Sequence, residues 1–210
     1  MPDTIREDPR VTRSRALILD ASRRVFLEDG YQAATVEAVA AQAGIAKRTI
    51  YNLYGDKDSL FRATILSAIE IADAFSASLA TEVRQVGSSM DDVHQIARRL
   101  AAATLRGPAL PLRRLLVMES HRFPELVAEY RQRAPEAVMT ALADLFRSLT
   151  DRGMLRTADP RIAAEHFAFL VMGADLDRGM FTGSVPSRER VRTRADAGAT
   201  AFIAAYAVPR

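Results

Sequence analysis

Apolar residues recur at spacings of three and four positions through almost the whole chain, and no segment shows sustained alternation of apolar and polar residues. One such stripe precedes Gly30 and consists of Ile18, Ala21, Ser22, Val25 and Phe26. A period near 3.6 is typical of amphipathic helices, whereas alternation is the pattern of half-buried strands. The sequence therefore predicts an all-α protein.

Glycine and proline residues divide the chain into about nine expected helices. Their ranges are 13–29, 36–43, 46–54, 57–86, 90–105, 110–121, 124–152, 160–178 and 187–206. Pro135 lies inside the seventh range and should kink that helix or split it in two. The fourth helix would be roughly 45 Å long, which is enough to bridge two bodies. We expect a flexible arm at residues 1–11, a first domain at 12–56 and a second at 57–210.

Composition limits the classes of protein that the chain can belong to. With 210 residues, of which 49% are hydrophobic, it can bury a sizeable core. The longest uncharged run covers residues 198–209, too short for a membrane span, and the N-terminus lacks the apolar stretch of a signal peptide. The absence of cysteine excludes disulfides and thiolate catalysis. We expect a cytoplasmic protein without membrane association, and the net charge of +3 says little about its partners.

The segment TVEAVAAQAGIAKRTIYNLYGDKDSL changes character at Gly44. Thr35 is a good N-cap for the short helix before it, and Gly44 permits the positive φ that a tight corner requires. Two short helices joined in this way are typical of a helix-turn-helix, in which the second helix enters the DNA major groove. Lys47 and Arg48 can donate to guanine or phosphate, and Tyr51 can reach a backbone oxygen. The alternative is a solvated helix face with Tyr51 as a packing residue.

Residues 13–60 resemble the TetR family of transcriptional regulators. The resemblance rests on a first helix ending in Gly-Tyr, a Thr-capped second helix ending in Ala-Gly, the Thr-Ile-Tyr that follows, and Lys57 with Leu60. It implies phosphate contacts from Thr35 and Tyr51, and base-reading positions on the third helix. The DNA-binding residues expected are Thr35, Val36, Lys47, Arg48, Thr49, Tyr51, Asn52 and Lys57.

Within the C-terminal part, the stretch at residues 122–173, RFPELVAEYRQRAPEAVMTALADLFRSLTDRGMLRTADPRIAAEHFAFLVMG, is similar to the regulatory domain of AcrR-like and AefR-like members of this family. That similarity implies a helical bundle that holds an effector and dimerises through its last two helices. These helices carry an apolar stripe that includes small residues, which permit close approach. The expected dimer residues are Ala163, Phe167, Leu170, Val171, Ala174, Ala195, Ala199, Phe202, Ile203 and Tyr206. The alternative is that the same stripe packs inside one monomer.

An effector pocket has to be inferred from unusual residues on apolar helix faces. Methionine and phenylalanine adapt to apolar ligands, and a few polar groups can orient them. The candidates are Met118, His121, Phe123, His166, Phe169, Met172 and Asp175. The alternative is that these are ordinary core or surface residues. The three histidines lie on different expected helices, so we expect neither a metal site nor a cofactor.

An enzyme and a helical scaffold are the two alternatives to a regulator. The chain has no glycine-rich phosphate loop, serine elbow or paired-carboxylate pattern, so no catalytic residue is predicted. A helical scaffold with a vestigial helix-turn-helix is the other alternative, because Ala46 provides no side-chain N-cap and Leu53 stands where the family often has His or Tyr. The sequence favours a homodimeric repressor that leaves a pseudo-palindromic DNA operator when it binds a small, mostly apolar effector.

Overall fold

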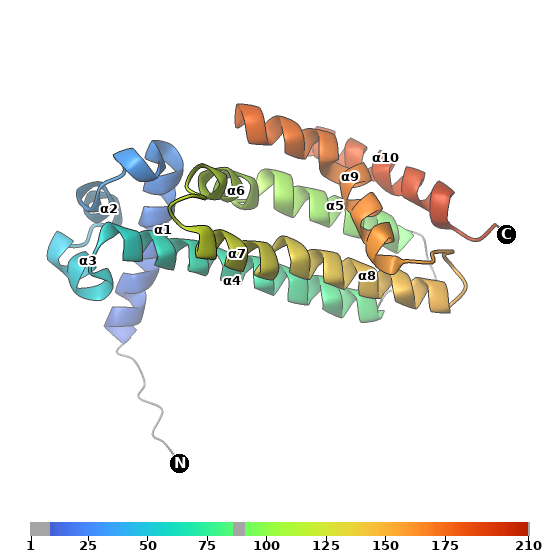
Figure 1. Ribbon diagram of the computed structural model, residues 1–210, viewed down its shortest axis with the longest axis horizontal. Coiled ribbons are helices and arrows are strands. Elements are labelled where there is room, and N and C mark those ends of the chain that lie inside the picture. Colours follow the sequence, from blue (N-terminus) through green and yellow to red (C-terminus); the bar gives the residue numbers. More distant parts are fainter. Residues whose placement is uncertain (1–8, 86–90, 210) are drawn as a thin grey trace, which may run out of the picture.

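The computed structural model describes residues 9–85 and 91–209 (Figure 1). Within these ranges the chain is helical nearly throughout, and the only β-type pairing is an isolated bridge between Leu155 and Ala207. Ten helices follow one another: α1 (Pro9–Ala33), α2 (Val36–Ala43), α3 (Lys47–Tyr54), α4 (Lys57–Gln85), α5 (Asp91–Arg106), α6 (Ala109–Met118), α7 (Pro124–Arg133), α8 (Pro135–Asp151), α9 (Pro160–Thr182) and α10 (Arg188–Tyr206). The predicted all-α fold is confirmed.

Local sequence signals set the corner between α2 and α3. The Thr35 hydroxyl accepts a hydrogen bond from the backbone N–H of Ala38 at 3.1 Å, which caps α2. Gly44 adopts the left-handed conformation with φ 66°, so the chain can turn directly into α3. Ala46 makes no side-chain cap for α3, because its methyl group cannot accept a hydrogen bond. The predicted helix-turn-helix geometry is therefore present.

Several boundaries differ from those expected. Pro9 opens α1, so residues 9–11 are helical rather than part of an arm, since proline suits the first turn of a helix. Residues 1–8 of the expected arm lie outside the described ranges. Pro135 splits its segment into α7 and α8, one of the two outcomes expected, because proline has no N–H to continue the ladder. Helix α9 runs four residues beyond 178 and ends at Gly183 with φ 69°.

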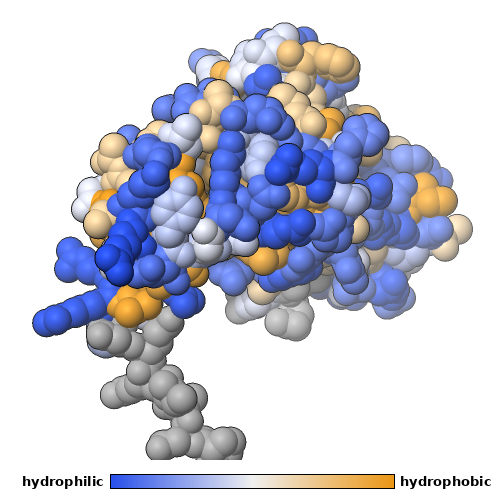
Figure 2. Space-filling model, turned by 60° about the vertical axis from the view of Figure 1, so that its left-hand side comes forward, coloured by the Kyte–Doolittle hydropathy of each residue, from blue (hydrophilic) through white to orange (hydrophobic). Residues whose placement is uncertain are grey.

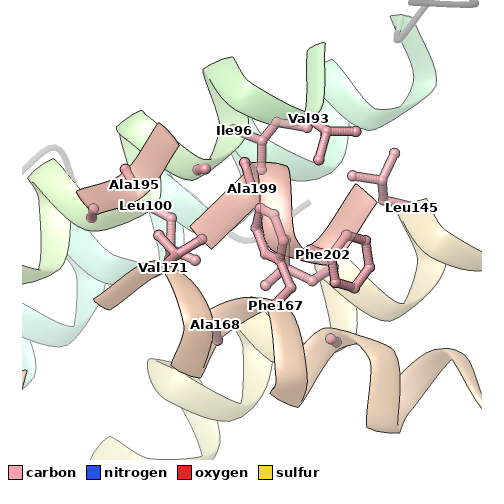
Figure 3. Packing of buried hydrophobic residues seen from close by; sticks show 14 of the residues in the cluster. Val93, Ile96, Leu100, Leu145, Phe167, Ala168, Val171, Ala195, Ala199 and Phe202 are labelled. Carbon is pink, nitrogen blue, oxygen red and sulfur yellow. The ribbon is translucent and has the colours of Figure 1, made fainter. Parts of the chain in front are cut away.

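Two hydrophobic clusters hold the fold together. The first joins α1, α2, α3 and the N-terminal half of α4 to α6 and α7 through residues such as Phe61, Leu115 and Phe123. The second lies between α5, α8, α9 and α10, where Phe167, Val171 and Phe202 point toward one another (Figure 3). The first cluster crosses the domain boundary expected between residues 56 and 57. Packing thus ties the helix-turn-helix directly to α6 and α7.

Helices α9 and α10 approach each other closely at Gly198. A Cβ atom at this position would lie 2.5 Å from the carbonyl oxygen of Leu170 and 2.8 Å from the Cα atom of Val171. Both are backbone atoms, so a side chain cannot be accommodated by rotating a neighbour. The close crossing therefore depends on this glycine.

Replacing Gly198 with Ala should destabilise the protein by about 1–2 kcal/mol, because overpacking outweighs the better helix propensity of alanine. This corresponds to a fall in Tm of about 2–8 °C for a chain of this size. Gly173→Ala is the control, since its added methyl meets only the exposed Phe169 side chain at 3.3 Å. Equal Tm values for Gly198→Ala and wild type, measured by circular dichroism, would contradict the close packing.

Candidate DNA-binding and effector sites

Helix α3 presents a polar face at one end of the molecule. Lys47, Arg48, Tyr51 and Asn52 are exposed, whereas Ile50 is 1% exposed and anchors the helix to the first hydrophobic cluster. Figure 1 shows α3 at the outer edge of the α1–α3 unit, and Figure 2 turns this end forward, where hydrophilic side chains predominate. Thr49 is half-buried. The structure thus brings the four expected recognition side chains onto one accessible surface.

Lys47 is held by partners within the chain. Its ammonium group forms an ion pair with Glu37 of α2 and lies 5.5 Å from the centre of the Tyr51 ring. The hydrogen bond to Glu37 raises the pKa of Lys47, and the same bond lowers the pKa of Glu37. Both groups are exposed, so a phosphate can compete with Glu37 for this lysine.

Three other expected DNA-binding residues have side chains that are buried or bonded within the protein. The Val36 side chain is 5% exposed, so only the backbone of this residue is available at the start of α2. The Thr35 hydroxyl already caps α2. The Lys57 ammonium donates to the carbonyl of Gln32 at 3.0 Å and lies 4.5 Å from the centre of the Tyr31 ring. Lys57 therefore fastens the end of α1 to the start of α4.

A polar junction that the sequence did not reveal connects α4 with the segment between α6 and α7. Arg122 donates two hydrogen bonds to the Asp58 carboxylate at 3.0 and 3.1 Å, and the hydroxyl of buried Tyr31 donates to the same carboxylate. The bond from Tyr31 lowers the pKa of Asp58. Burial, assisted by the Asp58 charge, raises the pKa of Tyr31 to about 12. The junction fixes the N-terminus of α4 relative to α6 and α7.

Phe123 belongs to this junction and not to an effector pocket. The side chain is 1% exposed, and its ring centre lies 4.9 Å from that of Phe61 and 5.3 Å from that of Tyr31. The guanidinium of Arg62 lies 4.9 Å from the Phe123 ring and pairs with Glu125. The expectation that Phe123 contacts a ligand is corrected, because neighbouring aromatic rings cover it.

A cavity of about 290 Å³ lies at the centre of the C-terminal part. Helices α4, α5, α6, α8 and α9 and the end of α7 supply its walls, which are mainly apolar. Its lining residues are Ala68, Ile71, Leu100, Ala103, Thr104, Gly107, Pro108, Ala109, Leu112, Arg113, Tyr130, Ala134, Pro135, Val138, Met139 and Met172. Cavities of this size and character commonly hold small organic ligands.

Met172 is the one expected effector residue that lines this cavity. Met118 and Phe169 are 64% and 70% exposed, and His121 is also exposed. His166 is exposed and lies 2.6 Å from the Tyr206 hydroxyl. These side chains follow the same helical spacing as core residues but point toward solvent. Sequence periodicity alone could not distinguish the two directions.

Asp175 is buried for a different reason from the one expected. Its carboxylate is 4% exposed and receives Arg178 at 2.7 Å and Arg190 at 2.8 Å, with Arg194 at 3.5 Å. Burying a carboxylate is costly unless charged partners surround it. Arg190 and Arg194 therefore join α10 to α9, and Asp175 does not line the central cavity.

Most of the expected dimer residues pack inside the monomer. Ala163, Phe167, Val171, Ala195, Ala199 and Phe202 are all at most 1% exposed, and Ile203 and Tyr206 pack against the same cluster. The expected role of the six fully buried residues is corrected, because α5 and α8 already cover this stripe (Figure 3). Leu170 is 48% exposed, and Ala174 is also exposed. Together with Ile162 and Phe169, these two residues give α9 a second, uncovered apolar face.

These features define a DNA-binding transcriptional regulator with a ligand cavity. A profile for bacterial regulatory proteins of the tetR family matches residues 18–64, and one for the AefR-like transcriptional repressor C-terminal domain matches residues 91–208. The chain belongs to the TetR family, as the sequence resemblance predicted. No helix in the described part of the chain is long and apolar enough to cross a membrane.

Individual relatives agree with this assignment. A structure from Mesorhizobium loti MAFF303099, assigned to TetR-family transcriptional regulators, is 30% identical with a TM-score of 0.85, over 96% of this chain and all of the other. The flavonoid-responsive regulator FrrA is 25% identical with a TM-score of 0.64, over 95% of this chain and all of FrrA. The transcriptional repressor AcnR of Corynebacterium glutamicum is 42% identical over 52 residues, which span 25% of this chain and only 28% of AcnR.

Asp58→Asn tests the polar junction through its pH dependence. Because the folded protein lowers the pKa of Asp58, the ionised carboxylate stabilises the fold above the unfolded pKa near 4, and this contribution is lost as the pH falls through the folded value. The Asp58 side chain is 42% exposed, so the variant should lose only about 0.5–1 kcal/mol at pH 7. The difference from wild type should shrink by pH 3.

Urea unfolding at the two pH values measures this difference. Glu28→Gln, at an exposed position on α1, is the control and should differ little from wild type at either pH. If the free energies of unfolding of Asp58→Asn and wild type differ by the same amount at pH 7 and pH 3, the carboxylate charge does not hold the junction.

Proposed function

We propose that the chain acts as a homodimeric repressor that binds a pseudo-palindromic operator and releases it when a small, mostly apolar effector enters the central cavity. The observation that carries this proposal is that α6 belongs to both sites. Leu112 lines the cavity and also lies in the hydrophobic cluster of the helix-turn-helix. A ligand that displaces α6 therefore acts on the same packing that positions α3.

Dimerisation is supported by the uncovered face of α9 and α10. Phe169 and Leu170 are 70% and 48% exposed, and both border a hollow of about 340 Å³ between the two helices. Small residues of α10, Ala197 and Ala201, form its opposite side. A two-fold axis would let the large α9 side chains of each protomer pack over the small α10 residues of its partner. The proposed interface is thus the solvent-exposed face of α9 and α10, and not the apolar stripe of these helices that packs inside the monomer.

Release is proposed to pass through α4 and α6. Helix α4 starts at the polar junction beside the helix-turn-helix and supplies Ala68 and Ile71 to the cavity wall. A ligand lodged there can change the tilt of α4 and thereby the distance between the two recognition helices of a dimer. An effector changes operator affinity only if it binds the two conformations unequally. Coupling of about 1–3 kcal/mol would weaken operator binding about five- to 150-fold.

Phe169→Glu should shift the protein from dimer to monomer, because the charge would be buried without a partner in the proposed interface. Sedimentation velocity measures the state directly. Val117→Glu is the matched control: Val117 is 56% exposed on α6 and does not border the hollow between α9 and α10, so this variant should stay dimeric. A Phe169→Glu protein that remains dimeric at micromolar concentration would place the interface elsewhere.

DNA selected from a random pool by the purified protein should contain an inverted repeat with half-sites about 34–36 Å apart, or a multiple of that distance. Lys47→Ala should weaken binding. Glu37→Gln should strengthen it, because it removes a negative charge beside the DNA and frees Lys47. With about four to eight phosphate contacts, log affinity should fall against log salt with a slope of roughly 0.9 per contact.

Arg147→Ala removes a positive charge from α8, far along the chain from α3, and should leave operator affinity unchanged. A single asymmetric site bound by one protomer would reject the dimeric repressor. Affinity that does not respond to salt would reject phosphate binding by the α3 face. A compound that fills the cavity without altering operator affinity would mean that the cavity is not the switch.

A further inference from the structure

The central cavity contains three side chains that can donate hydrogen bonds within an otherwise apolar lining. Among its described lining residues, Arg113 carries the only charge, and Thr104 and Tyr130 provide the only hydroxyl groups. Leu100, Val138, Met139 and Met172 line the remainder with hydrocarbon and thioether surface. The lining thus combines an extended apolar surface with a few polar groups on α5, α6 and α7.

Tyr130 is a largely buried phenol in the cavity wall. The residue is 8% exposed, and no hydrogen bond of its hydroxyl to another described residue is found. Burial raises the pKa of Tyr130, and the positive charge of Arg113 acts in the opposite direction. Tyr130 can therefore gain a hydrogen bond from a ligand that brings an acceptor.

Arg113 also lacks an acidic partner within the described part of the chain. Two other half-buried arginines are neutralised, Arg133 by Asp73 at 2.6 Å and Arg161 by Glu136. A guanidinium in a mainly apolar wall attracts an anion, and its planar fork suits the two oxygens of a carboxylate. A single cation matches a singly charged group better than a doubly charged phosphate ester.

We propose that the cavity binds a monocarboxylate with an apolar body, whose carboxylate accepts hydrogen bonds from Arg113 and Tyr130. This inference rests on the proposed function, because it names the chemical class of the effector for the same cavity. The hydrocarbon part of the ligand lies against Leu100, Val138 and Met172. Arg113 directly follows Leu112, which packs in the helix-turn-helix cluster, so the carboxylate is anchored to the helix proposed to transmit the signal.

Binding of a matched set of probes to the full-length protein tests the proposal by isothermal titration calorimetry. The probes are octanoate, 1-octanol and octylamine, which share a chain and differ in charge. Octanoate should bind wild type at least about tenfold more tightly than 1-octanol does, because the hydrogen bonds to its carboxylate are charge-assisted. Octylamine should bind most weakly. Arg113→Gln should abolish the preference for octanoate, and Tyr130→Phe should reduce it.

Arg114→Gln is the control variant, since Arg114 is the neighbouring arginine on α6 but does not line the cavity. Operator binding without any probe and thermal unfolding establish that each variant is folded. Equal affinity for octanoate and 1-octanol, no binding of any probe, or an octanoate affinity unaffected by Arg113→Gln would overturn the proposal while leaving DNA binding intact. Arg113-dependent octanoate binding that leaves operator affinity unchanged would support the ligand class and reject the proposed release mechanism.

Discussion

The packing of Phe61 against three other aromatic rings is the contact on which the arrangement of the molecule depends. Phe61 is fully buried, and its ring centre lies 5.1 Å from Phe26, 5.0 Å from Tyr31 and 4.9 Å from Phe123. Aromatic pairs in edge-to-face or offset geometry stabilise one another beyond their area of contact. Since these rings come from α1, α4 and the segment before α7, they join the DNA-binding helices to the effector part without a flexible linker.

The polar junction fixes the relative orientation of the elements that this apolar contact brings together. Arg122 and Tyr31 both bind Asp58 at the start of α4, and Lys57 holds the end of α1. Hydrophobic packing tolerates small shifts, whereas hydrogen bonds to a carboxylate require defined distances and angles. A change in the position of α6 or α7 therefore has to move α4 and α1 with it or break these bonds. The junction is suited to transmit a displacement rather than absorb it.

The sequence predicted the helix-turn-helix well because its signals are local. Thr35, Gly44 and the polar run from Lys47 act within one or two helical turns, and each has the expected conformation or exposure. The assignment of faces on α9 failed because both sides of this helix are apolar. Periodicity shows that Phe167 and Phe169 differ in direction, but only the positions of α5 and α8 determine which of them is covered. Arg113 was missed because a lone arginine on a helix is indistinguishable from a surface residue until its neighbours are known.

Two-fold symmetry affects how strongly a small ligand can act. In the proposed dimer each protomer carries one cavity and one recognition helix, and operator binding requires both helices to fit their half-sites together. If an effector weakens the binding-competent arrangement of each protomer by tenfold, about 1.4 kcal/mol, two independent protomers give roughly a hundredfold loss. A modest energetic difference at Arg113 and Tyr130 is therefore sufficient for a large change in operator occupancy. This is consistent with a cavity whose polar part is only a few groups, because the switch needs differential binding and not a large total affinity.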